Sequence, residues 1–325
     1  MKDIAIIIPV YKAHDTIKQT LCSIFMQKAV EFTCYLVVDG EEVGSYDYLK
    51  NQFNEIDVKI HYLEKNAGPG VARQYGIDHS QEPYISFIDA DDTYLSSLAL
   101  YYQMQPLLDE KNILVSTNFL QENKDHTMKL RDRDMVWMHG KMYRRAFLDK
   151  YDIRFNDTRA NEDVGVNTQV QCLANEEEQV FMSQNVTYMW QWRDGSTVRT
   201  DNHAYAFNES VEGYVINKIY AFETVLSKRE IDDGIKYFII GAMTHLFKKY
   251  LAAMLRAPKQ MKHIKKWAKR YYFKIYKKVD KEYIEKAERT VLLASLNPSP
   301  DQAGHYYDEF VKWKQLLEGN RKVRK

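Results

Sequence analysis

Short apolar runs alternate with amphipathic segments along the first third of the chain. Ile4–Ile8 is a continuous aliphatic run, and from Thr16 to Met26 the apolar residues recur every three or four positions. The run predicts a strand that is buried on both faces, and the period predicts a helix with one apolar face. The same reasoning predicts further strands at 32–38, 58–63, 84–88 and 113–117, and further helices at 46–53, 71–79 and 96–108.

This alternation of strands and helices predicts an α/β fold with a mostly parallel, doubly wound sheet. Ligands of such sheets bind beyond the carboxyl ends of the strands. Three polar segments directly follow predicted strands, namely Pro9-Val10-Tyr11, Asp39-Gly40 and the acids from Asp89 to Asp92. We therefore expect these segments to meet in one crevice.

The pattern changes in the second half of the chain. Residues 130–192 mix short strands with two short helices, and the chain is helical after about Ala204. We expect two domains, an α/β domain at 1–204 and a basic α-helical domain at 205–325. Within the second, Gly234–Val279 contains no Asp or Glu and 13 Lys and Arg residues. Such a segment is a solvated helix face, a contact with an anionic membrane, or a contact with nucleic acid phosphates.

The composition is that of a globular protein. Of 325 residues, 45% are hydrophobic and 28% are charged, and the formal net charge of +1 excludes a polyanion binder by overall balance. The three cysteines form no CxxC pair, which argues against a zinc site or a disulfide framework. No run of roughly 18 apolar residues occurs. We expect a cytoplasmic protein, with peripheral membrane contact as an option through the basic segment.

The segment 87-FIDADD-92 places Asp89, Asp91 and Asp92 at the end of an apolar run. Clustered carboxylates suit a hard divalent cation such as Mg²⁺ or Mn²⁺. An EF-hand is excluded, because Tyr94 stands where its loop requires Gly and Leu100 where it requires Glu. A Mg²⁺-type ion at a strand end usually shares its shell with phosphate oxygens, so a diphosphate ligand is expected.

Seven segments in order make the first 200 residues resemble the family 2 glycosyltransferases. They are 6-IIIPVYKAHDTIKQTLCSI-24, 36-LVVDG-40, 66-NAGPGVARQYGI-77, 87-FIDADD-92, 139-HGKMYRRAFLDKYDIRF-155, 161-NED-163 and 190-WQWRDGSTVR-199. The resemblance implies a GT-A fold and an inverting, metal-dependent transfer from a sugar nucleotide. The helical C-terminal part matches no family pattern.

The resemblance also implies roles for individual residues. Asp163 corresponds to the catalytic base, with Glu162 beside it. Asp89, Asp91 and Asp92 correspond to the acids that hold Mn²⁺ or Mg²⁺. The donor contacts that the resemblance implies are Pro9, Val10, Tyr11, Asp39, Arg73, Asp89, Ala90, Asp91, His139, Arg193 and Ser196.

One motif departs from the family. The family usually has two Asp followed by Gly and Ser where this chain has Val38-Asp39-Gly40-Glu41. The choice of nucleobase therefore stays open, although a UDP-sugar is the expected donor.

Several of these residues also have ordinary structural interpretations. Glu162 and Asp163 are acids of the kind that favour the first turn of a helix. Arg73 also fits a surface helix position, and His139 fits a packed core position among aromatic and methionine side chains. Arg193 and Ser196 also fit a solvated hairpin. His203 is a further candidate metal ligand.

The leading hypothesis is a hexosyltransferase that acts on a hydroxyl of a cell-surface glycan, a teichoic acid or a lipid-linked saccharide. A nucleotidyltransferase on a similar fold is the competing enzyme. A phage-type glycosyltransferase acting on modified DNA bases would explain the basic segment, and so would a degenerate, non-catalytic GT-A module that presents basic helices to nucleic acid or membrane. A homo-oligomer stays open.

Overall fold

The computed structural model describes residues 2–193 and 203–319, and the side chains of 203 and 204 are not described. The chain divides into two compact units, Met1–Ser196 and Thr197–Lys325. The boundary expected at 204–205 lies eight residues beyond this division. The two units are described separately below.

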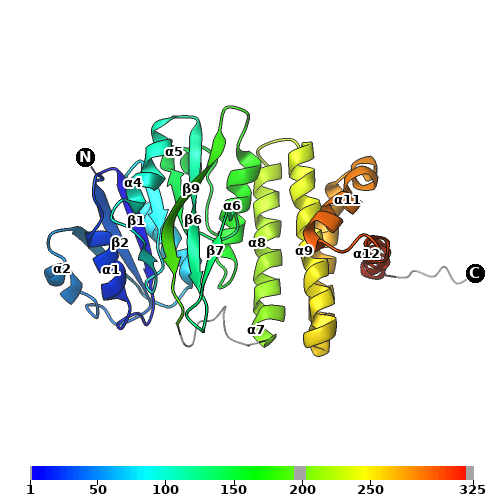
Figure 1. The fold of residues 1–325 in the computed structure, drawn as a ribbon, viewed down its shortest axis with the longest axis horizontal. Helices are drawn as coiled ribbons and strands as arrows, with labels where there is room; N and C mark the ends of the chain where they lie inside the picture. The colour runs from blue at the N-terminus through cyan, green and yellow to red at the C-terminus, as the bar shows by residue number, and fades with distance from the viewer. Residues whose placement is uncertain (1, 194–202, 320–325) are drawn as a thin grey trace, which may run out of the picture. The chain divides into compact units, whose positions relative to one another are not determined.

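The first unit is built on a mixed sheet (Figure 1), which has nine strands among the described residues, in the order β3-β2-β1-β4-β8-β6-β9-β5, with β7 paired to β6. The strands are β1 (Ile4–Val10), β2 (Phe32–Asp39), β3 (Asp57–Leu63), β4 (Tyr84–Phe87), β5 (Thr93–Tyr94), β6 (Asn112–Glu122), β7 (Met128–Arg131), β8 (Lys141–Arg144) and β9 (Gln179–Trp190). The helices are α1 (Ile17–Phe25), α2 (Tyr48–Gln52), α3 (Pro69–Asp78), α4 (Ala99–Met104), α5 (Arg145–Lys150) and α6 (Glu162–Leu173).

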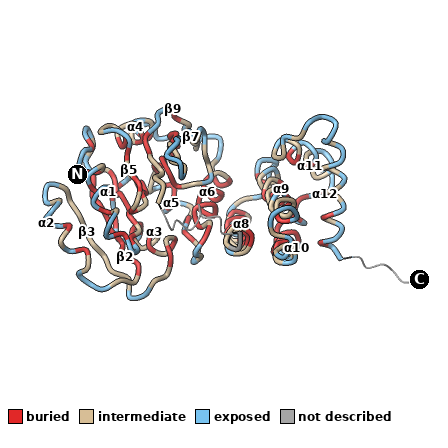
Figure 2. The backbone as a smooth tube through the Cα atoms, turned by 60° about the horizontal axis from the view of Figure 1, so that its bottom comes forward, coloured by how far each residue is buried: buried red, intermediate tan, exposed pale blue. Residues whose placement is uncertain are grey.

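Strands β3, β2, β1 and β4 run parallel, as the sequence predicts. Strand β1 is buried on both of its faces, which explains its continuous aliphatic run, and its neighbour β2 is coloured as buried in Figure 2. Ile6 and Ile8 belong to the core cluster that α1 closes with Leu21 and Ile24. Ile7 lies on the other face, where α3 packs. The four strands therefore end at one edge, each with helices beside it.

The other half of the sheet is not parallel. Strand β8 lies between β4 and β6 and is antiparallel to both, and β5 and β7 are also antiparallel to their neighbours. Strand β6 is parallel to β9. The expected α/β fold is confirmed, but its sheet is mixed rather than mostly parallel, because a four-residue strand from distant sequence enters the gap beside β4.

A glycine fixes the turn after β2. Gly40 has φ +75°, and a Cβ atom there would lie 2.0 Å from the backbone nitrogen of Asn66. The loop that follows β3 therefore approaches the backbone of Gly40 more closely than any side chain permits. This contact brings residues 66–68 next to the end of β2.

Replacing Gly40 with alanine should lower the free energy of unfolding by about 2–3 kcal/mol, because a strained φ and a backbone clash add up. Thermal unfolding measures this as a midpoint lowered by about 5 °C or more. Gly44→Ala is the matched control, since Gly44 also has a positive φ (+91°) but its nearest neighbouring atom would be 4.0 Å away. Equal losses in the two variants would show that the contact with Asn66 contributes nothing.

The second unit is helical and consists of α7 (His203–Phe207), α8 (Glu209–Leu226), α9 (Asp233–Arg256), α10 (Met261–Lys274), α11 (Lys281–Leu296) and α12 (Ala303–Glu318). Helix α9 packs against α8, α10 and α11. The core of this second unit contains aromatic residues, all of them buried, such as Phe222, Phe247, Phe310 and Trp313. The buried Glu288 accepts hydrogen bonds from Tyr276 and Lys314, so an internal ion pair also lies in this core.

Helix α9 is, among the described residues, the one helix long and apolar enough to cross a bilayer by length and composition. In its most apolar window 44% of the residues are buried inside the protein. This is weak evidence for a membrane span, because the core helix of a protein without one meets the same test.

Candidate functional site

The end of β2 holds the start of α3. The carboxylate of Asp39 accepts hydrogen bonds from the backbone N–H groups of Ala67 (2.7 Å) and Gly68 (2.8 Å), one on each oxygen. These are the free amides that precede a helix, and a carboxylate satisfies them well. Asp39 thus has a structural role that the sequence did not reveal. Its predicted contact with the nucleobase stays a prediction, since each oxygen keeps a further lone pair.

Helix α3 in turn positions Arg73. Its guanidinium donates from Nη1 to Oε1 of Glu162 (2.5 Å) and from Nη2 to Oδ1 of Asp89 (2.6 Å). Arg73 is 5% exposed, so it is not a surface helix residue. It joins two motifs that lie 73 positions apart in the sequence, namely the acids after β4 and the acids that begin α6. The predicted catalytic acids and the predicted metal-binding acids therefore belong to one connected cluster.

Three side chains of this cluster are placed to share a cation. Carboxylate oxygens of Asp89 and Asp92 and a ring nitrogen of His139 all lie within 4.8 Å of one another. Two carboxylates and an imidazole fit Mn²⁺, whereas Mg²⁺ prefers an all-oxygen shell. The donor set thus fits a divalent ion, and it includes His139, which the sequence suggested as a donor contact rather than as a metal ligand.

Burial and neighbouring charges shift the pKa values of the two carboxyl groups in this set. Burial, and then the charges of Asp89 and Asp91, raise the pKa of Asp92 well above its usual value. Burial also pushes the pKa of Asp89 upward, but the charge of Arg73 and then that of His139 outweigh it and leave this pKa lowered. Asp92 would have to lose its proton to bind a metal, so metal binding there should strengthen as the pH rises.

His139 lies in an aromatic enclosure. Its ring stacks on Tyr188 with centroids 4.8 Å apart and also contacts Phe119 (5.1 Å), Trp190 (5.0 Å) and Trp137 (6.1 Å). His139 is therefore packed in the core and at the same time placed as a candidate metal ligand. The aromatic rings fix the orientation of the imidazole, as the supporting groups of metal-binding histidines do.

Asp163 begins α6 together with Glu162. Both are buried, which is unusual for acids that only cap a helix, and Oδ1 of Asp163 accepts from the backbone N–H of Val164 (2.8 Å). Burial, followed by the charge of Glu162, raises the pKa of Asp163 to about 8. A carboxyl group with such a pKa is a stronger base near neutral pH than an ordinary Asp. Glu162 is engaged by Arg73, which favours Asp163 as the group that accepts a proton.

Asp91 lies apart from the three-residue set. A carboxylate oxygen of Asp91 is 3.5 Å from Nη1 of Arg193, so these two predicted donor contacts lie together. The predicted metal ligation by Asp91 is not tested by this arrangement and stays a prediction. Ser196 lies outside the described residues, and so does the side chain of His203.

The predicted donor contacts at the end of β1 and after β4 differ in exposure. Val10 is fully buried and Ala90 is 7% exposed, and both belong to the core, whereas Tyr11 is 45% exposed at the strand end. Of the predicted contacts Pro9, Val10 and Tyr11, the aromatic ring of Tyr11 is therefore the one available to a nucleobase. Pro9 is half-buried.

Two residues of the site escaped sequence reasoning. Tyr188 donates its hydroxyl proton to Oδ2 of Asp92 (2.6 Å), and its oxygen accepts from the backbone N–H of Asp89 (3.3 Å). Glu41 accepts from the backbone N–H of Lys12 (2.7 Å), which ties the end of β1 to the end of β2. Nothing in the sequence around Tyr188 signals this role, but Glu41 stands in the motif that departs from the family.

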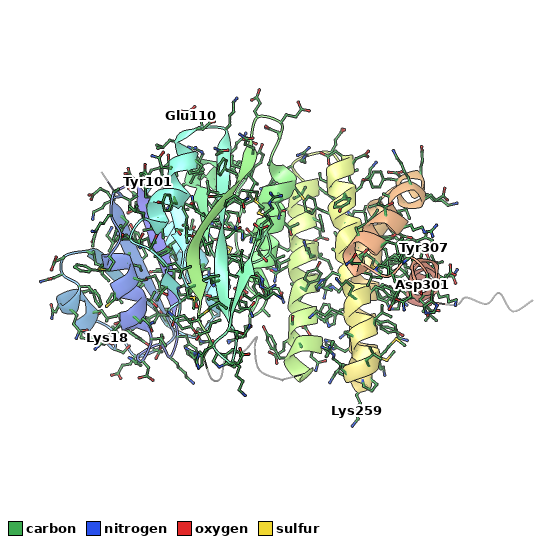
Figure 3. The ribbon with its side chains drawn as sticks, in the orientation of Figure 1. Lys18, Tyr101, Glu110, Lys259, Asp301 and Tyr307 are labelled. Atoms are coloured by element: carbon green, nitrogen blue, oxygen red, sulfur yellow. The ribbon has the colours of Figure 1, made fainter. Side chains whose placement is uncertain are left out.

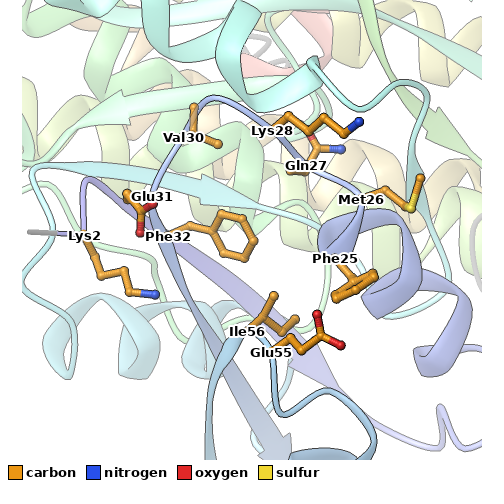
Figure 4. A pocket seen from close by; sticks show the side chains of 10 residues that line it. All are labelled: Lys2, Phe25, Met26, Gln27, Lys28, Val30, Glu31, Phe32, Glu55 and Ile56. Atoms are coloured by element: carbon orange, nitrogen blue, oxygen red, sulfur yellow. The ribbon is translucent and has the colours of Figure 1, made fainter.

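A separate cavity of about 550 Å³ lies at the opposite edge of the sheet. Its lining includes Lys2, Phe25, Phe32 and Ile56, which come from the starts of β1, β2 and β3 and from the end of α1 (Figure 4). Asp39 and the acids Asp89 and Asp92 lie at the carboxyl ends of β2 and of the parallel strand β4, which is the other edge. The cavity is therefore remote from the site, and it contains none of the predicted functional residues.

Three comparisons bear on this site. Among curated proteins, the chain is 36% identical over 93 residues (28% of the chain) to TuaG of Bacillus subtilis, named as a teichuronic acid biosynthesis glycosyltransferase, and 26% identical over 224 residues (60% of the chain) to the glycosyltransferase GlyA of Streptococcus pneumoniae. The matches span about a third of these relatives, 36% and 31% of their lengths.

Among solved structures, S. aureus TarS 1–349 in complex with UDP-GlcNAc has a TM-score of 0.69 at 16% identity and covers 99% of this chain and 92% of TarS 1–349. The mannosyltransferase PcManGT of Pyrobaculum calidifontis, in complex with GDP-Man and Mn²⁺, has a TM-score of 0.54 at 13% identity, covering 99% and 88%. These likenesses establish the fold. Residues 5–160 match the model of glycosyl transferase family 2. This match covers just under half of the chain and makes residues 5–160 similar to glycosyl transferase family 2, the family that the motifs resemble.

Proposed function

We propose that this chain transfers a sugar from a UDP-sugar to a hydroxyl group of an acceptor, with inversion at the anomeric carbon. The observation that carries the proposal is the double contact of Arg73, which holds Asp89 and Glu162 within one cluster. Transfer needs one set of groups for the leaving diphosphate and another for the acceptor, and this cluster contains both. A degenerate module would have no need of buried acids both for the leaving diphosphate and for the acceptor.

The chemistry of the step assigns roles to the residues. The bond between the anomeric carbon and the diphosphate oxygen breaks while the acceptor oxygen bonds to that carbon from the opposite side. Asp163 accepts the proton of the acceptor hydroxyl as this bond forms. Asp89, Asp92 and His139 would hold Mn²⁺, which when bound neutralises the negative charge of the departing diphosphate. Arg73 keeps Asp89 ionised and in place.

The donor and acceptor classes rest on relatives and neighbours. TarS was solved with UDP-GlcNAc, and PcManGT with GDP-Man and Mn²⁺. TuaG is named for teichuronic acid biosynthesis, and a match 30% identical over 104 residues is a teichoic acid poly(glycerol phosphate) polymerase of Staphylococcus epidermidis. We propose a UDP-sugar as the donor, an anionic cell-surface polymer or a lipid-linked saccharide as the acceptor, and the cytoplasm as the location.

A donor screen by thermal unfolding tests this proposal. A UDP-sugar at about 100 times its Kd should stabilise the chain by about 2.7 kcal/mol, several degrees in the midpoint, and only when Mn²⁺ is present. GDP-mannose, a nucleoside triphosphate and Mn²⁺ alone are the comparisons. Asp92→Asn should abolish the shift even when Mn²⁺ is present, because the amide cannot offer a charged ligand.

The same screen separates the competing functions. Slow release of UDP from the stabilising donor in the absence of acceptor would support a transferase. Stabilisation by a nucleoside triphosphate with release of pyrophosphate would instead identify a nucleotidyltransferase. If no sugar nucleotide shifts the midpoint or is cleaved, with or without Mn²⁺, the proposal is wrong.

A further inference from the structure

The basic side chains of the helical unit fall into two groups. Some have partners within the unit: Lys236 is 2.8 Å from a carboxylate oxygen of Asp280, and Lys248 donates to the carbonyl oxygen of Ser295 (2.7 Å). Lys249 is partly buried, and burial lowers its pKa. These residues belong to the packing of α9. The remaining basic residues follow a different pattern.

One face of α10 carries the second group. Its exposed residues recur three and four positions apart and therefore lie on one side of the helix; they are Lys262, Lys266, Lys269, Arg270, Phe273 and Lys274. We call these six residues the basic face. The opposite side of α10 is buried and includes Ile264, Trp267 and Tyr271. The basic face is thus the outer side of a helix that is anchored in the unit by its apolar side.

The positive charge of the basic face is weakly compensated. No acid occurs between Gly234 and Val279. Lys274 is 3.9 Å from Glu223, and both side chains are about half exposed (60% and 49%). Exposed ion pairs of this kind contribute little stabilising free energy, and salt screens them. The face therefore presents several positive charges to a partner.

Apolar side chains project among these charges. Phe273 is 47% exposed at the C-terminal end of the basic face, and Lys269 lies over its ring (5.9 Å). In the last turn of α9, just before the turn into α10, Leu255 is 87% exposed and Met254 is 49% exposed, and Lys259 projects from the turn that follows (Figure 3). An aliphatic side chain as exposed as Leu255 gains from entering an apolar phase.

We propose that the basic face and the turn before it dock on the anionic surface of a lipid bilayer. Lys and Arg attract anionic headgroups, while Phe273, Leu255 and Met254 enter the boundary between headgroups and acyl chains. Nucleic acid phosphates would pair with the Lys and Arg side chains, but they offer no apolar phase for Leu255 and Met254. The surface would hold the enzyme where a lipid-linked or surface acceptor is made, independently of the transfer step itself.

Vesicle cosedimentation of the full chain tests the charges. Binding to vesicles of phosphatidylglycerol and phosphatidylcholine should exceed binding to phosphatidylcholine alone and should weaken as salt rises. Removing three charges with Lys262→Gln, Lys266→Gln and Lys269→Gln should weaken binding on the order of a hundredfold. The matched control is Lys281→Gln, Lys286→Gln and Arg289→Gln on the exposed side of α11, which should leave binding within about threefold. Equal losses, or no binding to anionic vesicles, would overturn the proposal.

A double variant tests the choice of partner. Phe273→Ser combined with Leu255→Ser keeps the charge and should weaken vesicle binding about tenfold or more while leaving the binding of duplex DNA unchanged. If vesicle binding is unaffected, or if DNA binds more tightly than anionic vesicles at the same salt concentration, the surface is a nucleic acid contact instead. Donor hydrolysis should be unchanged in all these variants, so a failure here is distinguishable from a failure of the proposed transfer.

Discussion

The Asp163→Asn variant is expected to lose about two to four orders of magnitude in transfer rate while it binds the donor as tightly as the original chain. General base catalysis by a positioned carboxylate contributes about that much, and an amide cannot accept the proton of the acceptor hydroxyl. Asp163 contacts neither Arg73 nor the three-residue metal set through a hydrogen bond that the described residues show. Titration calorimetry with donor and Mn²⁺ measures the binding, and release of UDP with acceptor measures the rate.

Glu162→Gln is the matched comparison for this prediction. Glu162 is equally buried but is engaged by Arg73, so its loss should cost less in rate than the loss of Asp163. If Asp163→Asn keeps the rate within about tenfold while Glu162→Gln loses it, the base is Glu162. If Asp163→Asn loses donor binding, its assignment to the acceptor side is wrong.

The pKa of Asp163 gives the same variant a second readout. Its value of about 8 lies above the ordinary 3.8, so between about pH 4 and 8 the folded chain holds a proton that the unfolded chain has released. The free energy of unfolding should therefore fall as the pH rises through this range, and Asp163→Asn should remove that part of the slope. The transfer rate should rise over the same range and level off above about pH 8, where the base is ionised.

The Arg73→Met variant is expected to lose about 3 kcal/mol or more in free energy of unfolding. Removing one partner of a buried ion pair leaves the other charges without compensation, and here two carboxylates, Glu162 and Asp89, lose the same cation. Burial opposes the charge of Arg73, but the neighbouring acids Asp89, Glu162 and Asp163 outweigh it and raise the pKa of the guanidinium. Chemical denaturation of both proteins at neutral pH measures the difference.

Arg154→Met is the control for this prediction. Arg154 also contacts two carboxylates, those of Asp78 (2.9 Å) and Asp152 (2.7 Å), but it is 48% exposed. Such exposed pairs contribute less than about 1 kcal/mol. Equal losses in the two variants would show that burial of Arg73 adds nothing.

The pH dependence of the Arg73 effect has a defined sign. The pKa of Asp89 is lowered below the ordinary 3.8 of Asp, in spite of burial, by Arg73 first and His139 second. The stability that this contact contributes is therefore fully present above about pH 5 and is lost as the pH falls through the folded pKa. The difference between the original chain and Arg73→Met should shrink in acid. A difference that grows in acid would contradict the ionised state of Asp89.

Local patterns predicted the parallel half of the sheet because each of its strands carries its own signal. The run around Ile7 is apolar on both faces, and the strand is covered on both faces by helices of the same segment of chain. Strand β8 (Lys141–Arg144) could not be predicted in this way. Its place between β4 and β6 depends on a fit to strands that are remote in sequence, and four residues carry too little periodicity to indicate a partner.

The site was predictable to the extent that its residues follow strand ends or family motifs. Asp89, Asp92 and Asp163 were predicted in this way, and the structure brings Asp89 and Asp92 together with His139. What the sequence could not indicate was the set of contacts between motifs. The clamp of Asp39 on the start of α3 and the bridge made by Arg73 depend on how the elements pack.

The position of β8 also sets an order of events during synthesis. Strands β4 (Tyr84–Phe87) and β6 (Asn112–Glu122) leave the ribosome before β8, yet in the folded sheet both pair with β8. Until residue 144 has emerged, the growing chain has two unpaired strand edges that face the same gap, and direct pairing of β4 with β6 would exclude the strand that belongs there. The gap between β4 and β6 therefore closes only with this four-residue segment, and slow translation before it should prolong the life of an incomplete, aggregation-prone intermediate.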